Sequence, residues 1–174
     1  IRDRLQQVPI AITAVSGQSL NDRAIHTLQD LSNTVPSIDF RNGASNKDRT
    51  VFVRGVGTIS TSPGVESSVS TVLDGVVLTR PGQATLDVGE VERIEVLRGP
   101  QGTLYGRNTN GGAINITTKR PTQTFTADAS LEYGSFNAVR AEAGVGGPII
   151  ADKLAFRAAA QVTKDDGYTH NRVT

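Results

Sequence analysis

"VERIEVLRGPQGTLYGRNTNGGAINITTKRP", residues 91–121, places a glycine-rich segment between two runs of β-branched residues. Gly106 and Gly111 have the spacing of a phosphate-binding P-loop, but Gly112 and Ala113 stand where that loop requires a lysine and a Ser or Thr. A dinucleotide-binding turn would open a helix, whereas these glycines lead into the strand pattern Ala-Ile-Asn-Ile-Thr-Thr. The segment therefore predicts no phosphate site, and its glycines need another explanation.

The chain up to Pro121 has the pattern of a mixed α and β region. A helix is predicted over residues 16–31, with Ser19 as its N-cap and Asp22 at the capping-box position. Its apolar residues fall on one face, which predicts packing against a sheet: Leu20, Ala24, Ile25, Leu28 and Leu31. Short β-like runs bounded by Gly, Asn, Asp or Pro occur at residues 8–15, 37–40, 50–55, 69–78, 91–99 and 111–119.

Beyond Pro121 apolar and polar residues alternate, which predicts consecutive antiparallel hairpins. Residues 125–133 fit the alternation at every position, and further strands are predicted over residues 139–145 and 153–163. Turns are predicted at Gly134 and Ser135 and within residues 146–153. Strands of about nine to eleven residues suit a tilted crossing of an outer membrane, but a soluble β-sandwich shows the same alternation. Three strands cannot close a barrel, so the membrane interpretation requires a longer chain.

Composition excludes several functional classes. The formal net charge of +1 provides no field to gather nucleic acid, so nucleic-acid binding is not expected. The chain has no cysteine, which excludes disulfides and thiolate zinc sites. No apolar run approaches the roughly 18 residues of a membrane-spanning helix. His26 and His170 are too far apart in sequence to suggest a metal pair, and no nucleophile, histidine and carboxylate cluster together, so neither a metal site, a cofactor nor an enzyme is predicted.

Residues 91–121 resemble the plug domain of TonB-dependent outer-membrane receptors. Three earlier stretches resemble the same domain in the same order: "LQQVPIAITAVSG", "TVFVRGVG" and "VSTVLDGVVL". The resemblance implies an α+β plug domain over residues 1–121, with a small mixed sheet and short helices. It further implies that residues 122–174 are antiparallel β-hairpins of an incomplete transmembrane β-barrel.

The function implied by this resemblance is gated uptake of a scarce solute across the cell outer membrane of a Gram-negative bacterium. A ferric siderophore is the expected solute, and receptors of the same family for carbohydrate, cobalamin or another chelate are the alternative. The implied partners are outer-membrane lipid and TonB, which binds a short segment expected ahead of this chain by strand addition. The other alternative is a soluble, stand-alone binding module with a plug-like fold.

The resemblance also assigns roles to residues in its motifs. Arg54 and Arg98 are similar to arginines that lock the plug to barrel glutamates, which would lie beyond Thr174, although each could instead be a solvated arginine at a strand end. The glycines are expected to serve backbone geometry, through positive φ or close approach, and to be structural: Gly55, Gly99, Gly102, Gly106, Gly111 and Gly112.

Solute contact is expected in loops over residues 41–48, 58–70 and 79–83, the second of which is rich in hydroxyl groups. The same composition also suits an ordinary loop. The candidate ligand-facing residues are Arg41, Asn42, Asn46, Thr58, Ser60, Thr61, Ser62, Glu66, Ser67, Arg80 and Gln83.

Overall fold

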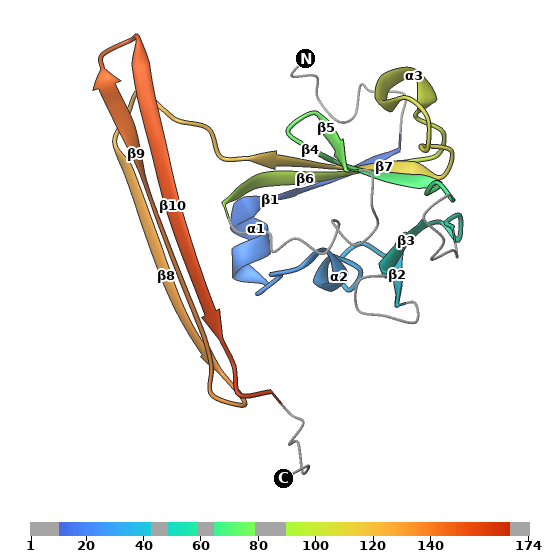
Figure 1. Cartoon of the computed structure of the whole chain (residues 1–174), viewed down its shortest axis with the longest axis horizontal. Helices are drawn as coiled ribbons and strands as arrows, with labels where there is room; N and C mark the ends of the chain where they lie inside the picture. Colours follow the sequence, from blue (N-terminus) through green and yellow to red (C-terminus); the bar gives the residue numbers. More distant parts are fainter. Residues whose placement is uncertain (1–10, 43–48, 59–64, 79–89, 168–174) are drawn as a thin grey trace. The chain divides into compact units, whose positions relative to one another are not determined.

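The computed structural model describes residues 11–42, 49–58, 65–78 and 90–167 of the chain (Figure 1). The chain divides into two compact units, Ile1–Thr118 and Lys119–Thr174. Within the described ranges, no helix has the length and apolar character needed to span a membrane.

The first unit is built on a five-stranded mixed sheet. In spatial order its strands are β1 (Ile12–Ser16), β6 (Val91–Arg98), β7 (Gly112–Thr118), β4 (Val69–Leu73) and β5 (Val76–Leu78). β4 and β7 are parallel, and the other neighbouring strands are antiparallel. The strand that comes last in the sequence, β7, therefore lies at the centre of the sheet.

One face of this sheet carries the hydrophobic core. It is covered by α1 (Gly17–Asp22), by α2 (Leu28–Leu31) and by the two-stranded sheet of β2 (Ile38–Asn42) and β3 (Arg49–Val53) (Figure 1). Alternate residues of the strands point into this layer, as the period of two requires. The fully buried side chains at its centre include Leu28, Leu31, Val53, Ile94, Val96 and Ile114.

The single helix predicted over residues 16–31 is wrong, because the chain forms two short helices there. Ser16, not Ser19, is the first N-cap, and its hydroxyl accepts a hydrogen bond from the Ser19 amide at 3.3 Å. Ala24 has a φ of +50° and breaks the helix. Thr27 and Asp30 then start α2 with a complete capping box. Of the five predicted apolar positions, Ala24 alone is exposed.

The run predicted over residues 69–78 is a hairpin of two strands. Asp74 and Gly75 form its turn with φ values of +47° and +87°, which fits the preference of Asp-Gly for tight hairpins. This turn reverses the chain so that β5 becomes one edge of the sheet.

The second unit is a three-stranded antiparallel sheet of β8 (Thr126–Gly134), β9 (Ala138–Ile150) and β10 (Leu154–Lys164), with β9 in the middle. The turn predicted within residues 146–153 is shorter than expected. β9 continues through Gly146, Gly147 and Pro148 to Ile150 and pairs with β10, so that only residues 151–153 form the turn.

The two faces of this second sheet differ in polarity, as the alternation predicted. One face carries an ion pair between Arg157 Nη2 and Asp128 Oδ1 at 3.1 Å, and Arg140 Nε donates to Glu142 Oε1 at 2.7 Å. The other carries large apolar side chains that are exposed in this chain, among them Leu131 and Val162. The predicted fold class, a small mixed sheet with short helices followed by antiparallel strands, is confirmed.

Candidate functional site

The glycine-rich segment between β6 and β7 folds back on itself. After β6 the chain forms α3 (Gly102–Tyr105) and returns, so that the Gln101 amide donates to Thr109 O at 3.0 Å and the Gly99 amide to Gly111 O at 3.2 Å. The fully buried Thr109 donates its hydroxyl to Gly106 O at 2.7 Å. Because these amides are bonded within the segment, they do not form an open cradle for a phosphate.

The predicted glycines occupy special backbone positions, with one exception. The φ value is positive at Gly55, Gly99, Gly106 and Gly112, and a Cβ at Gly111 would lie 2.9 Å from Val56 Cγ1. Gly102 has neither feature, because it begins α3 with open space around its Cβ position. The predicted close approach of Gly102 to the barrel stays a prediction, because the described residues place nothing against it.

Gly112 has the strongest requirement for glycine among these positions. Its φ is +147°, and a Cβ there would overlap the carbonyl oxygen of Leu97 on the neighbouring strand. Gly17 is a second such position that the predicted set of glycines did not include, and a Cβ there would overlap Val91 O. The sequence did contain a signal for this requirement, because Gly17 stands where a predicted strand passes into a predicted helix.

The two candidate lock arginines end strands of different sheets. Arg54 follows β3 with a φ of +52°, and its side chain is exposed. Arg98 ends β6; its Nη2 donates to Thr13 Oγ1, whereas its Nε is buried and has no hydrogen-bond partner among the described residues. Neither arginine pairs with a carboxylate in the part of the chain that the structure describes.

Hydroxyl groups fasten the two ends of the loop between β3 and β4. The Thr58 hydroxyl lies 2.8 Å from Ser68 Oγ and accepts a hydrogen bond from the Ser68 amide at 2.9 Å. Ser67 bonds to the backbone of Val69, and Glu66 forms an exposed ion pair of 3.0 Å with Arg107. Three candidate ligand-facing residues, Thr58, Glu66 and Ser67, are thus brought together where the two ends of this loop meet. This junction of residue 58 with residues 66–68 is called the neck of the loop.

The remaining candidates are dispersed. Arg41 lies on β2, 4.6 Å above the ring of Phe52 and in an ion pair with Asp39. Asn42 ends β2. The other candidates lie outside the described residues: Asn46, Ser60, Thr61, Ser62, Arg80 and Gln83.

A polar cluster lies on the sheet face opposite α1 and α2. Glu95 accepts hydrogen bonds from Arg93 Nε at 2.9 Å and from Asn115 Nδ2 at 2.8 Å. Burial alone would raise the pKa of Glu95, but these two hydrogen bonds outweigh it and lower the pKa. Burial and the nearby charge of Glu95 raise the pKa of Tyr105.

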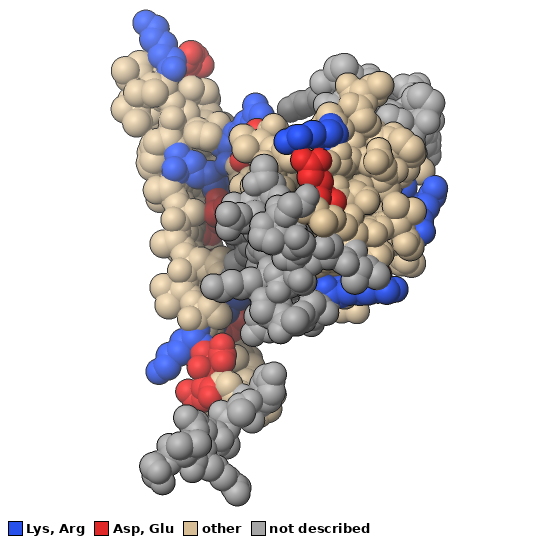
Figure 2. Space-filling model, turned by 45° about the vertical axis from the view of Figure 1, so that its right-hand side comes forward, with Lys and Arg blue, Asp and Glu red and all other residues tan. Residues whose placement is uncertain are grey.

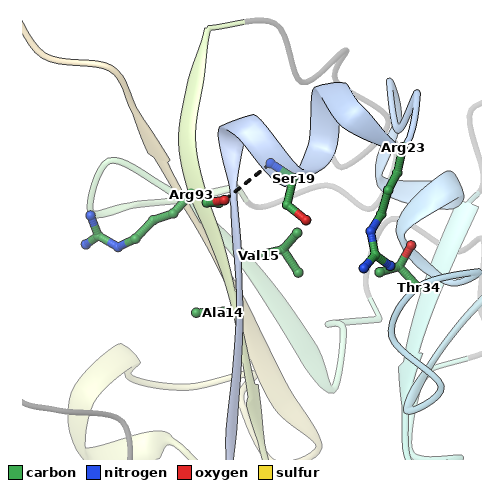
Figure 3. Close-up of a pocket in the computed structure, with 7 residues that line it drawn as sticks. Ala14, Val15, Ser19, Arg23, Thr34 and Arg93 are labelled. Atoms are coloured by element: carbon green, nitrogen blue, oxygen red, sulfur yellow. Dashed lines mark hydrogen bonds between the residues drawn. The ribbon is translucent and has the colours of Figure 1, made fainter.

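A hollow of about 480 Å³ lies beside β1, at the edge of the sheet. Figure 3 shows Val15, Ser19, Arg23 and Thr34 on one side of this strand and Ala14 and Arg93 on the other. Elsewhere on the surface, acidic and basic side chains are interspersed in the view of Figure 2, without a large patch of one sign.

A family profile described as "TonB-dependent Receptor Plug Domain" matches residues 4–113. The chain belongs to this family. The plug matches the pesticin receptors of Yersinia pestis and Yersinia enterocolitica with 32% identity over 95% of the chain and 24% of theirs. It matches the iron-regulated outer membrane virulence protein of Vibrio cholerae with 28% identity over 93% of the chain and 26% of the relative.

Solved structures give the same result for the fold. The ferric yersiniabactin uptake receptor of Yersinia pestis superposes with a TM-score of 0.72 at 28% identity, covering 90% of this chain and 24% of the receptor. The ferripyoverdine receptor of Pseudomonas aeruginosa superposes with a TM-score of 0.76 at 26% identity, covering 91% of this chain and 21% of the receptor. The chain therefore spans about a quarter of the length of the relatives it matches.

These comparisons confirm the family that the sequence predicted. Membership of the family locates the plug in the outer membrane of a Gram-negative bacterium. The matched relatives are named as receptors, which supports a role other than catalysis.

Proposed function

We propose that this chain is the plug, with the first barrel strands, of an outer-membrane receptor that takes up a ferric siderophore using energy supplied through TonB. The observation that carries the proposal is the match of the plug family over residues 4–113, together with relatives named for ferric siderophore uptake. The three amphipathic strands of the second unit support it, since their lengths suit tilted membrane-crossing strands.

The arrangement of the plug supports a gate rather than a reaction centre. Among the described residues no cluster of histidine, aspartate and glutamate is suited to hold a metal ion. Entry of the iron as a chelate is proposed because the matched relatives are named for ferric pyoverdine and ferric yersiniabactin. The hydroxyl-rich neck at Thr58, Ser67 and Ser68 is proposed to position the loop that contacts the chelate, because it fixes both ends of that loop.

Arg54 and Arg98 are proposed to hold the plug in the barrel. A guanidinium group binds a carboxylate through two parallel hydrogen bonds, which suits a partly buried contact. Support comes from Arg98, whose buried Nε has an unused donor among the described residues. A barrel carboxylate would satisfy that donor.

Uptake by cells tests the function. A siderophore-deficient strain that expresses the complete receptor should accumulate radiolabelled iron from ferric pyoverdine or ferric yersiniabactin, and accumulation should stop when TonB is deleted. Uptake of labelled cobalamin or maltodextrin in place of iron would assign a different solute and keep the transport mechanism. Absence of the protein from outer-membrane fractions would reject the receptor itself and favour a soluble binding module.

A further inference from the structure

The outer edge of β1 is open among the described residues. β1 pairs only with β6, and no described group bonds to the amides and carbonyls of Ile12 and Ala14. An open strand edge is usually blunted by a charged residue or a proline, because its free groups pair readily with another chain. β1 reads Ile-Thr-Ala-Val-Ser and has neither.

The register of β1 and β6 identifies which backbone groups of β1 point away from β6. The Arg98 amide donates to Ala11 O at 3.1 Å, so residues 11 and 98 form a hydrogen-bonded pair. Such pairs alternate along an antiparallel ladder, and the register Thr13 with Val96 and Val15 with Ile94 continues this one. The backbone groups of Ile12 and Ala14 therefore point outward, away from β6, and Ala14 lines the hollow.

The side chains around the hollow differ between the two faces of the strand. On the face of Val15, the hydroxyls of Ser19 and Thr34 stand beside the guanidinium-bearing Arg23 (Figure 3). Arg23 pairs with no acidic side chain within the described ranges. On the other face Ala14 is small, and Arg93 is already paired with Glu92 and Glu95 at 3.3 and 2.9 Å. The described residues thus leave the charge of Arg23 unmatched on one face, whereas the charge of Arg93 on the other face is already matched by carboxylates.

We infer that β1 accepts an extended segment of another protein by strand addition, and that this segment carries acidic side chains on alternate residues. Its backbone pairs with Ile12 and Ala14, and its acidic side chains lie beside Arg23, Ser19 and Thr34. Its intervening side chains lie over Ala14 and need only be apolar. This site belongs to the sheet of the plug itself and shares no residue with the candidate solute loops.

Fluorescence anisotropy with two labelled peptides tests the site on the complete receptor in detergent. The probe alternates valine and glutamate, and the comparison peptide alternates valine and lysine. The glutamate peptide should bind and the lysine peptide should not. The same glutamate peptide with N-methyl groups on alternate residues should also fail to bind the receptor, because methylation removes the backbone hydrogen bonds that define strand addition.

Matched variants locate the binding. Ala14→Pro removes the outward amide without touching the β6 ladder and should weaken binding about tenfold. Ala14→Val keeps that amide and should bind as the wild type does. Arg23→Gln should weaken binding about two- to fivefold, the range of an exposed charge contact.

Three peptide-binding results would each overturn the inference. They are failure of the wild-type receptor to bind the glutamate peptide, equal binding of the N-methylated peptide, and equal binding by a folded Ala14→Pro variant. If Ala14→Pro does not fold, the N-methylated peptide decides the question. Self-association of the wild-type receptor that Ala14→Pro abolishes would make a second copy the occupant and would reject the acidic partner.

Discussion

Asp74 and Thr118 are joined by two hydrogen bonds although they lie far apart in the sequence. The Thr118 amide donates to Asp74 Oδ1 at 2.9 Å, and the Thr118 hydroxyl donates to Oδ2 at 2.7 Å. In return, the Asp74 amide donates to Ile116 O at 2.9 Å. The turn between β4 and β5 therefore fastens the end of β7, at the last residue of the first unit.

Asp74→Ala should loosen this end of β7. The change removes both side-chain hydrogen bonds and leaves alanine at a φ of +47°, so we expect a loss of about 1–3 kcal/mol of local stability. Hydrogen exchange of the β7 amides in the complete receptor measures it. Asp74→Asn tolerates the same φ and keeps one acceptor, so its effect should be smaller; equal exchange in all three proteins would contradict the role of the carboxylate.

Gly112→Ala and Gly102→Ala form a matched pair. Alanine at position 112 would overlap Leu97 O at an unfavourable φ, so we expect a loss of about 3 kcal/mol or failure to fold. Alanine at position 102 meets open space in a helix and should be neutral or stabilise by up to about 1 kcal/mol. Denaturant unfolding and the yield of folded receptor measure both, and similar effects would contradict the backbone geometry described for Gly112.

Glu95 should make the plug sensitive to acid. The pKa of Glu95 is lowered in the folded state, so its stabilising contribution is complete above the unfolded pKa of about 4.3 and disappears as the pH falls through the lower folded pKa. Glu95→Gln should therefore reduce stability by about 1 kcal/mol at neutral pH and by less in acid. Unfolding curves at neutral and acidic pH test this sign, and a difference that grows in acid would reject it.

Arg54→Ala and Arg98→Ala should increase leakage of small antibiotics through the receptor. If each arginine pairs with a barrel carboxylate, removing one partner of a buried pair costs about 3–5 kcal/mol. That loss would loosen the plug without unfolding the barrel. Antibiotic susceptibility and single-channel conductance report the leak. Unchanged permeability in both variants would reject the proposed lock.

Thr58→Val should weaken binding of the ferric siderophore severalfold while changing global stability by only about 1 kcal/mol, the usual contribution of one hydrogen bond. The variant loses the contacts to Ser68 that fix the neck of the loop. Thr58→Ser keeps the hydroxyl and should bind as the wild type does. Equal affinity in both variants would show that the neck does not position the solute loop.

Much of the fold could be predicted because strands are recognisable from local patterns, namely runs of β-branched residues and the alternation of apolar and polar residues. The runs at residues 91–99 and 111–119 became β6 and β7 within one or two residues, and the alternation beyond Pro121 gave the two faces of the second sheet. The helices within residues 16–31 were harder to predict. The apolar spacing from Leu20 to Leu31 suits one long helix, and only the Thr27–Asp30 capping box indicated a second start.

The candidate site was less predictable, because its geometry depends on contacts distant in sequence. Nothing local to Gly102 distinguishes it from Gly106, yet only Gly106 has a positive φ. Likewise, the open edge of β1 follows from the order of the strands, and that order cannot be read from the residues of β1 alone.

The central position of β7 has a consequence for how the chain is made. β6 and β4 both pair with β7, and without it they are not neighbours in the sheet. A growing chain that ends before Gly112 therefore lacks the strand that joins the two halves, and contacts between segments so distant in sequence form slowly. The five-stranded sheet is therefore expected to stay incomplete until almost all of the first unit has been synthesised.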